Sequence, residues 1–337
     1  MSKMKAVEVS KAGGDFKIVE RNIPAPGPGQ VLIKVEACGV CHSDYFVKEG
    51  LWPGLTFPRI PGHEIAGVVE TVGPGVTAWK KGQRVGVGWH GGQDNTCPAC
   101  RAGDFANCES NFITGFTYDG GYAEYLVAPV EAIARVPEGF DPAEAAPLLC
   151  AGITTFNALR HSGAGPGDLV VIQGIGGLGH LGIQFANKFG YHVVAVGRGP
   201  DSAALAKKLG AHEYLDSQAV NAVEELKKRG GAAVILATAP SSQAMSEIFH
   251  SLGRNGKLLI VGADMTPIQI PGAAFIQGRK GILGWAAGTH SDSEDTLRFA
   301  ALTGVRPMIE KFPFEKVAEA YARMMSGRAQ FRVVLTM

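Results

Sequence analysis

One glycine-rich stretch constrains the fold of this chain more than any other part: Gly174-Ile175-Gly176-Gly177-Leu178-Gly179. An apolar run, residues 169–172, precedes it, and residues 178–189 carry apolar side chains at helical spacing. A strand, a glycine turn and a helix form the setting in which the pattern G-x-G-x-x-G binds a dinucleotide. A second apolar run, residues 192–196, follows at the distance that a β-α-β unit requires. Loops with three glycines also occur without a ligand, but this setting predicts nucleotide binding.

Each glycine of the pattern has its own physical role. Gly174 permits the tight turn, Gly176 lets the backbone approach a pyrophosphate, and Gly179 lets the helix pack closely on the strand. The first turn of the helix then presents free N–H groups and the positive end of its dipole to the phosphates.

A chain of 337 residues is long enough for two domains with separate cores. Short β-branched runs at residues 31–36, 67–72 and 84–87 predict a compact β-rich domain. Later, apolar strands at residues 233–236 and 257–261 flank a helix-like segment at residues 242–252. Strands and helices that alternate in this way predict a parallel, doubly wound sheet.

The end of the chain carries a helical stretch at residues 314–325 and an apolar strand at residues 332–335. We expect this strand to return to the β-rich domain. Residues 1–150 and 288–337 would then form one domain, and residues 151–287 would be a nucleotide-binding insertion.

The net charge of +1 favours neither nucleic acid nor an anionic membrane as a partner. The first residues lead into strand-like sequence without the apolar region of a signal peptide, and no apolar run approaches the roughly 18 residues of a membrane span. We therefore expect a cytoplasmic protein.

The cysteines point to metal rather than to disulfides. All six lie within the first 150 residues: Cys38, Cys41, Cys97, Cys100, Cys108 and Cys150. Three disulfides would suit a small secreted chain, whereas clustered cysteines in a large intracellular protein more often bind metal. Cys41 follows a predicted strand and His63 follows a turn, and a catalytic zinc commonly takes three protein ligands of such types. The spacing does not identify a third ligand, and Cys150 also fits a small buried thiol at the start of a helix.

Two longer motifs narrow the interpretation. Gly39-Val40-Cys41-His42-Ser43-Asp44 and Pro61-Gly62-His63-Glu64-Ile65-Ala66-Gly67, followed by the glycine turn, resemble the zinc-dependent medium-chain alcohol dehydrogenases over essentially the whole chain. The resemblance implies an α/β protein with a doubly wound, Rossmann-type coenzyme domain and a β-rich, GroES-like catalytic domain. It also implies a small alcohol or aldehyde as substrate, and a homo-oligomer, with a homotetramer favoured.

The resemblance assigns the residues of the catalytic metal site. Cys41, His63 and Cys150 match the zinc ligands, and Glu64 matches a carboxylate that can approach the metal from behind. Asp44 matches the carboxylate that orients the liganding histidine, a usual role beside a metal. Arg332 is expected to pair with Asp44 from the C-terminal strand and is also grouped with the cofactor-binding residues. The alternative for Arg332 is a solvated charge at a strand end.

The same resemblance implies a mechanism. Zinc lowers the pKa of the alcohol, Ser43 relays its proton, and the alkoxide gives hydride to the nicotinamide. Many relatives carry a relay histidine where this chain has Phe46, so the proton is expected to leave through ribose hydroxyls and water, or through His42. Large aromatic residues at family cleft positions favour unbranched primary or aromatic alcohols: Phe46, Trp52, Trp89 and Trp285. Each of these aromatics is equally compatible with ordinary core packing.

A second metal site is indicated by Cys97-Pro98-Ala99-Cys100 and Cys108. The pattern C-x-x-C-x7-C in a polar loop is typical of a closed structural zinc. Relatives usually supply a fourth cysteine three residues before the first of these, Cys97, and here that position is Asp94. Either Asp94 completes the site with an oxygen ligand, or the site is weakened or empty. Cys38 has no partner at ligand spacing and is expected to be an inert strand residue.

The choice of nicotinamide cofactor depends on the end of the second nucleotide-binding strand, Val196-Gly197-Arg198-Gly199. Enzymes that use NAD usually carry an acidic residue there, which bonds the ribose 2′-hydroxyl. Arg198 instead suits the 2′-phosphate of NADP, which we favour. Alternatively Arg198 is solvated, and the nearest acidic residue is Asp201. The resemblance adds Thr154 near the nicotinamide and the backbone from Ile175 to Leu178 at the pyrophosphate.

Two competing functions follow from the same fold. A zinc-free reductase of quinones or activated double bonds would lack the triad of Cys41, His63 and Cys150. A nucleotide-binding relative without catalysis would have no need to retain Ser43 and Glu64. The sequence therefore favours a zinc-dependent alcohol dehydrogenase or aldehyde reductase.

Overall fold

The computed structural model describes residues 2–262 and 264–337, and the chain divides into two compact units. Unit 1 joins Met1–Ile153 to Ala287–Met337, and unit 2 comprises Thr154–Ala286. The first boundary lies three residues after the one expected from the sequence, and the second lies one residue before it.

Unit 2 is a six-stranded sheet in which every neighbouring pair of strands is parallel. In chain order the strands are β8 (Leu169–Gln173), β9 (His192–Gly197), β10 (Glu213–Asp216), β11 (Ala232–Ala237), β12 (Leu252–Ile260) and β13 (Gly281–Gly284). Their spatial order is β10-β9-β8-β11-β12-β13. The chain thus winds outward from β8 in both directions, which is the Rossmann arrangement, and the predicted fold class is confirmed.

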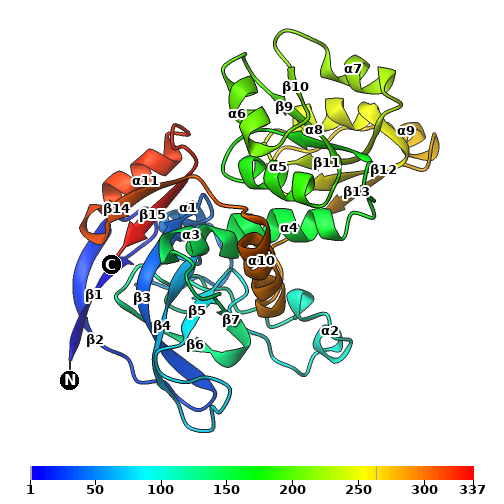
Figure 1. Cartoon of the computed structure of the whole chain (residues 1–337). Helices are drawn as coiled ribbons and strands as arrows, with labels where there is room; N and C mark the ends of the chain where they lie inside the picture. The colour runs from blue at the N-terminus through cyan, green and yellow to red at the C-terminus, as the bar shows by residue number, and fades with distance from the viewer. Residues whose placement is uncertain (1, 263) are drawn as a thin grey trace. The chain divides into compact units, whose positions relative to one another are not determined.

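Helices connect the strands of unit 2 (Figure 1). They are α4 (Ile153–Arg160), which begins at the unit boundary, α5 (Gly179–Lys188), α6 (Ser202–Leu209), α7 (Ala222–Lys228), α8 (Ser242–Ile248) with a 3₁₀ turn at Phe249–Ser251, and α9 (Gly272–Ile276). The central strands are buried along nearly their whole length, as Val170, Val171 and Ile172 on β8 illustrate. Parallel strands covered on both faces need such continuous apolar runs, which is why the sequence revealed them.

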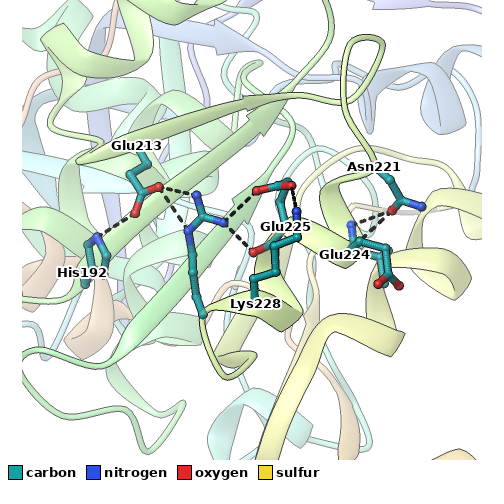
Figure 2. Close-up of polar contacts among 8 residues, drawn as sticks. His192, Glu213, Asn221, Glu224, Glu225 and Lys228 are labelled. Atoms are coloured by element: carbon teal, nitrogen blue, oxygen red, sulfur yellow. Dashed lines mark hydrogen bonds and ion pairs between the residues drawn. The ribbon is translucent and has the colours of Figure 1, made fainter.

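A charged network fastens α7 to the outer strands of this sheet (Figure 2). Glu213 at the start of β10 lies 3.2 Å from Nε2 of His192 on β9 and accepts from Arg229 Nη2 at 2.7 Å. The Asn221 side chain caps α7 by accepting from the N–H groups of residues 223 and 224. The network lies at the amino ends of β9 and β10, since His192 and Glu213 are the first residues of these strands.

Unit 1 contains an antiparallel hairpin and a larger sheet in which only β14 and β15 pair in parallel among the described strands. A hairpin pairs β1 (Lys3–Val9) with β2 (Phe16–Asn22). The larger sheet has the order β14-β15-β3-β4-β5-β7, with β6 paired to β3 as well. Its strands are β3 (Gln30–Val40), β4 (Ile65–Val72), β5 (Arg84–Val87), β6 (Tyr125–Pro129), β7 (Ile133–Arg135), β14 (Ile309–Pro313) and β15 (Arg332–Thr336).

Short helices and turns complete unit 1. They are α1 (Asp44–Glu49), α2 (Pro98–Arg101), α3 (Pro142–Pro147), α10 (His290–Thr303) and α11 (Val317–Met325), the 3₁₀ turns Phe105–Asn107, Val130–Ala132 and Phe314–Lys316, and a π-helical turn η3 (Leu148–Gly152). The C-terminal strand β15, red in Figure 1, pairs antiparallel with β3 and places Val333 opposite Val40. The expected return of the chain end to the β-rich part is therefore observed.

Within the described residues, none of the helices has both the length and the apolar character needed to cross a membrane. The cytoplasmic location stays a prediction.

Candidate metal centre and cofactor site

The first candidate ligand, Cys41, is held by the turn that connects β3 to α1. Its backbone N–H donates to Oδ2 of Asp44 at 2.8 Å, so a side chain three residues ahead closes the turn around it. Asp44 is completely buried, and a buried carboxylate requires such donors. The sequence C-H-S-D thus folds into a turn that fixes its own cysteine.

The second and third candidates, His63 and Glu64, stand immediately before β4. Gly62 precedes them at φ +100°, and a Cβ there would lie 2.5 Å from Cδ1 of Tyr122. Only glycine fits this backbone conformation and this close approach. His63 and Glu64 are fully buried, so both side chains point into the unit rather than to solvent.

The last candidate, Cys150, lies in the middle of the π-helical turn η3. The turn follows Pro147 at the end of α3, and proline has no N–H to continue an ordinary helical bond pattern. Local π-type winding is frequent at functional sites. Here it presents the thiol to the other three residues.

The donor atoms of Cys41, His63, Glu64 and Cys150 all lie within 4.8 Å of one another. The two sulfur atoms are 3.8 Å apart and form no disulfide. Their contact lowers the pKa of Cys41 and raises that of Cys150, because one thiolate accepts the S–H of the other. The sequence therefore identified four residues that the fold brings together.

Two buried atoms of the cluster are suited to bind a cation. Nε2 of His63 and Oε2 of Glu64 are inaccessible to solvent and have no hydrogen-bond partner among the described residues. Orphaned buried acceptors are costly unless an unseen group binds them. Two thiols and an imidazole are the donor types that zinc prefers, and a carboxylate is also acceptable. The residues present therefore fit a zinc ion.

Arg332 provides the counter-charge of Glu64. Its Nη2 donates to Glu64 Oε1, and both side chains are buried. Burial raises the pKa of Glu64 to about 7, against the opposing charge of Arg332. The expected pairing of Arg332 with Asp44 is wrong, since Glu64 is its partner. Because Arg332 is buried in unit 1, the alternative of a solvated charge at a strand end is also excluded.

Asp44 instead contacts His63 and a residue that sequence reasoning missed. Its Oδ1 lies 3.3 Å from Nδ1 of His63, while Oδ2 accepts from the hydroxyl of Tyr122 at 2.8 Å. The histidine thus turns Nδ1 toward the carboxylate and leaves Nε2 free for a metal. The tyrosine lies in the stretch Gly120-Gly121-Tyr122. In the sequence, only these two glycines indicated that the backbone here lies close to another segment.

The proposed proton-relay residues lie in the same turn. Ser43 precedes α1 but makes no capping hydrogen bond to the described residues of that helix. The neighbouring His42 is exposed, and its ring stacks on Tyr45 with 6.0 Å between centroids.

Three of the predicted substrate-facing aromatics gather beside His63. Phe46, Trp52 and Trp89 pack together in unit 1, and the Trp89 ring centroid lies 5.1 Å from that of His63. Trp285 belongs to unit 2.

The second cysteine group also converges, since the donor atoms of Asp94, Cys97, Cys100 and Cys108 lie within 4.8 Å of one another. Oδ1 of Asp94 already accepts from the N–H of Cys97 at 2.9 Å and from that of Thr96 at 2.8 Å, which lowers the pKa of Asp94. Asp94 is therefore an ionised carboxylate facing three thiols. Cys38 is buried in β3 outside both groups.

The glycine turn in unit 2 has the geometry that dinucleotide binding needs. Gly174 adopts φ +93°, and a Cβ on Gly179 would lie 1.9 Å from the carbonyl oxygen of Gly174. By contrast, a Cβ on Gly176 would meet no described atom within 4 Å. Gly174 and Gly179 are thus required by packing, whereas Gly176 leaves its backbone open to a ligand at the start of α5. Ile175, Gly177 and Leu178 complete this loop, and Thr154 opens unit 2.

The loop after β9 is hydrogen-bonded to a carboxylate that the sequence analysis overlooked. Asp216, at the end of β10, accepts from the N–H of Gly199 at 2.8 Å, and it lies opposite Gly197 in the register of the sheet. Arg198 is exposed and makes no hydrogen bond or ion pair with another described residue. Parallel strands end at one edge of a sheet, so the pairing of β9 with β10 was the signal that could have found Asp216.

The fold and the donor cluster together define an oxidoreductase. Residues 27–138 match the family model for the alcohol dehydrogenase GroES-like domain, and residues 177–301 match that for zinc-binding dehydrogenase. Together these matches cover more than half of the chain. The chain belongs to the zinc-dependent medium-chain alcohol dehydrogenase family.

Individual relatives agree with this assignment. Alcohol dehydrogenase patD of Penicillium expansum is 45% identical over 336 residues, which cover 100% of this chain and 98% of the relative. An alcohol dehydrogenase of Geobacillus stearothermophilus is 38% identical over 98% of both chains. Among solved structures, a cinnamyl alcohol dehydrogenase of Sorghum bicolor, SbCAD4, has a TM-score of 0.90 at 31% identity, covering 99% of this chain and 98% of its own.

Proposed function

We propose that this chain is a zinc-dependent alcohol dehydrogenase or aldehyde reductase that moves hydride between a primary aliphatic or aromatic alcohol and NADP. The observation that carries the proposal is the buried cluster of Cys41, His63, Glu64 and Cys150, whose donor atoms lie within 4.8 Å of one another. A cluster of this composition has no structural role that apolar residues would not serve better.

Cys41, His63 and Cys150 would hold the catalytic zinc, with Glu64 able to approach it. When bound there, zinc supplies the Lewis acidity that lowers the pKa of an alcohol or polarises an aldehyde. The chain's own contribution is to preset the donors. Asp44 orients His63 by its Nδ1, and Arg332 balances the charge of Glu64.

Ser43 is proposed to receive the hydroxyl proton at Oγ. A serine hydroxyl both accepts and donates, so it can pass a proton onward without holding a charge. His42 is adjacent in the chain and exposed to solvent, which makes it a suitable next carrier. Phe46 occupies the position of the relay histidine of many relatives and has no group that takes a proton.

The nicotinamide cofactor supplies the site that accepts or donates hydride. We assign its pyrophosphate to the backbone of residues 175–178 and to the N-terminus of α5. Arg198, exposed and unpaired with any described residue, favours the 2′-phosphate of NADP. Asp216 accepts a hydrogen bond from the N–H of Gly199. Its carboxylate is therefore less available to a ribose hydroxyl, which supports NADP over NAD. The location of Arg332 in unit 1 beside Glu64 supports a role at the metal rather than at the cofactor.

The substrate class rests on the aromatic side chains near His63. Phe46, Trp52 and Trp89 present flat apolar surface, which suits a linear or aromatic alcohol better than a bulky secondary one. The name of the sorghum relative, which refers to cinnamyl alcohol, points in the same direction.

We further propose that Asp94, Cys97, Cys100 and Cys108 hold a structural zinc. Three thiolates and one carboxylate form a closed tetrahedral set of accepted zinc ligands. Two zinc ions for each chain would support this assignment, and one would contradict it. By its family resemblance the chain is also proposed to form a homotetramer, which sedimentation would test.

The main experiment measures NADP-linked and NAD-linked absorbance changes with ethanol, benzyl alcohol and their aldehydes, on protein of known metal content. Cys41→Ser should lose one zinc and nearly all activity. Cys38→Ser is the matched control, because Cys38 is also a buried thiol, three residues before Cys41, but lies outside the cluster. Full activity after verified removal of all zinc would instead favour a zinc-free reductase. Zinc binding without activity on any substrate would favour a non-catalytic relative.

A further inference from the structure

A buried tyrosine lies directly behind the candidate metal ligands. The hydroxyl of Tyr122 donates to Oδ2 of Asp44 at 2.8 Å, and that oxygen also accepts from the N–H of Cys41 at 2.8 Å. The other carboxylate oxygen, Oδ1, lies 3.3 Å from Nδ1 of His63. One carboxylate therefore connects the phenol to two of the proposed ligands.

The position of the Tyr122 ring is determined independently of this contact. Its backbone N–H donates to the carbonyl of Pro61 at 3.0 Å, and its carbonyl accepts from the N–H of Val7 at 2.8 Å. The ring is fully buried and fills the space that glycine leaves at position 62. The hydroxyl is thus aimed at Asp44 by a rigid surrounding, which is what a group needs in order to orient its neighbour.

The hydroxyl is also a dependable donor. Burial raises the pKa of Tyr122 well above its ordinary value, with the Asp44 charge adding to the effect, so the phenol keeps its proton at neutral pH. A completely buried carboxylate that loses one of its donors keeps an unsatisfied oxygen. This favours rotation of the carboxylate toward another donor.

We propose that Tyr122 is a positioning residue of the metal centre: its hydroxyl fixes the Asp44 carboxylate, which in turn fixes the His63 ring and the Cys41 turn. The inference rests on the proposed function only in requiring that zinc binds to this cluster. The Tyr122 hydroxyl contacts Asp44 and is not one of the clustered donors, so its effect on the metal passes through Asp44.

The test is the release of zinc from the full-length protein to a chromophoric chelator. The release phase that belongs to the cluster is identified as the one that disappears in Cys41→Ser. Tyr122→Phe keeps the ring and removes only the hydroxyl. We expect this phase to become about tenfold faster, at the lower end of the effect of groups that support metal ligands.

Two controls separate positioning from general stability. Tyr118→Phe removes another hydroxyl of unit 1, which hydrogen-bonds Thr114 at 3.0 Å instead of the cluster, and it should leave the phase unchanged. Asp44→Asn should itself accelerate release, and adding Tyr122→Phe to it should produce little further change, because both variants disrupt one chain of contacts. Release from the Cys97 group should stay at the wild-type rate throughout.

The outcomes are distinct. If Cys41→Ser removes no release phase, zinc does not bind to the cluster and the proposed function is wrong. If it removes a phase and Tyr122→Phe leaves the rate of that phase unchanged, the role of Tyr122 alone is overturned. An equal acceleration by Tyr122→Phe in the wild-type and Asp44→Asn backgrounds would also overturn it, since the effect would not pass through Asp44.

Discussion

Gly39 is the position at which the addition of one methyl group should disturb the metal centre most. It lies on β3 opposite Glu64, and its N–H donates to the Glu64 carbonyl oxygen at 2.9 Å. A Cβ at position 39 would stand 1.9 Å from Glu64 Oε2 and 2.9 Å from Glu64 Cβ. Ordinary contacts begin at 3.4 Å, so Gly39→Ala must displace the carboxylate by about 1.5 Å, the difference between 3.4 and 1.9 Å.

The size of the effect follows from the partner of that carboxylate. Moving Glu64 separates it from Arg332, and both side chains are buried. Outright removal of one partner of a buried ion pair costs about 3–5 kcal/mol. Here the partner is displaced rather than removed, and alanine stabilises the folded state by about 0.4–1 kcal/mol through the unfolded chain. We expect Gly39→Ala to lower the free energy of unfolding by about 2–3 kcal/mol.

Guanidinium chloride denaturation of the full chain provides the measurement. Gly284→Ala is the matched control, because Gly284 is also a strand glycine but an added Cβ would meet no described atom within 4 Å. The double variant Gly39→Ala/Glu64→Ala removes Oε2 and Cδ, the atoms that would lie 1.9 and 2.8 Å from the added Cβ, so its loss should be smaller than the sum of the single losses. If Gly39→Ala and the wild type have the same midpoint and slope, the steric argument is refuted.

Three further predictions concern the relay, the cofactor and the sheet edge. Ser43→Ala should lower kcat/KM about 100-fold with zinc content unchanged, as the loss of a proton-transfer group does; unaltered steady-state rates would exclude the relay. Arg198→Asp should raise the KM for NADP at least tenfold, the loss expected for a hydrogen bond to a charged group, and should affect NAD little; equal effects on both cofactors would contradict the phosphate role. Glu213→Gln should lower the free energy of unfolding at pH 7 by only about 0.5 kcal/mol, because Glu213 is about one-third exposed. The hydrogen bond from Arg229 lowers the pKa of Glu213, so this stabilisation exists above the unfolded-state pKa near 4.3 and is lost as the pH falls through the folded-state pKa. In urea denaturation, the free energies of unfolding of the variant and the wild type should therefore converge in acid. A difference that persists in acid would contradict the assignment of this stabilisation to the charge of Glu213.

The fold was more accessible to sequence reasoning than the site, for a physical reason. Unit 2 strands are buried on both faces, so β8 and β9 read directly as apolar runs. The start of β12 did not, because residues 253–256 are Gly-Arg-Asn-Gly and Asn255 has φ +58°. A polar stretch with a left-handed residue is typical of a turn, and here it forms an irregularity between Leu252 and Lys257, which both pair with β11.

Within the site, local patterns could indicate candidates but not their partners. Cys150 required the family resemblance, since its approach to Cys41 depends on a π-helical turn more than a hundred residues away. The partner of Arg332 was predicted wrongly because two carboxylates lie close together in the fold. The structure distinguishes them: Oδ2 of Asp44 already accepts from Cys41 and Tyr122, whereas Glu64 has no such donors and takes the arginine.

The position of β15 inside its sheet, between the edge strand β14 and β3, has a consequence for biosynthesis. The arginine that neutralises Glu64 is synthesised after the whole of the inserted unit, which is contiguous in the chain. Domains generally fold as units while they are being made. Unit 1, whose synthesis begins before that of unit 2, is therefore completed after it. Until β15 is made, β3 has an unpaired edge and Glu64 lacks the charge of Arg332.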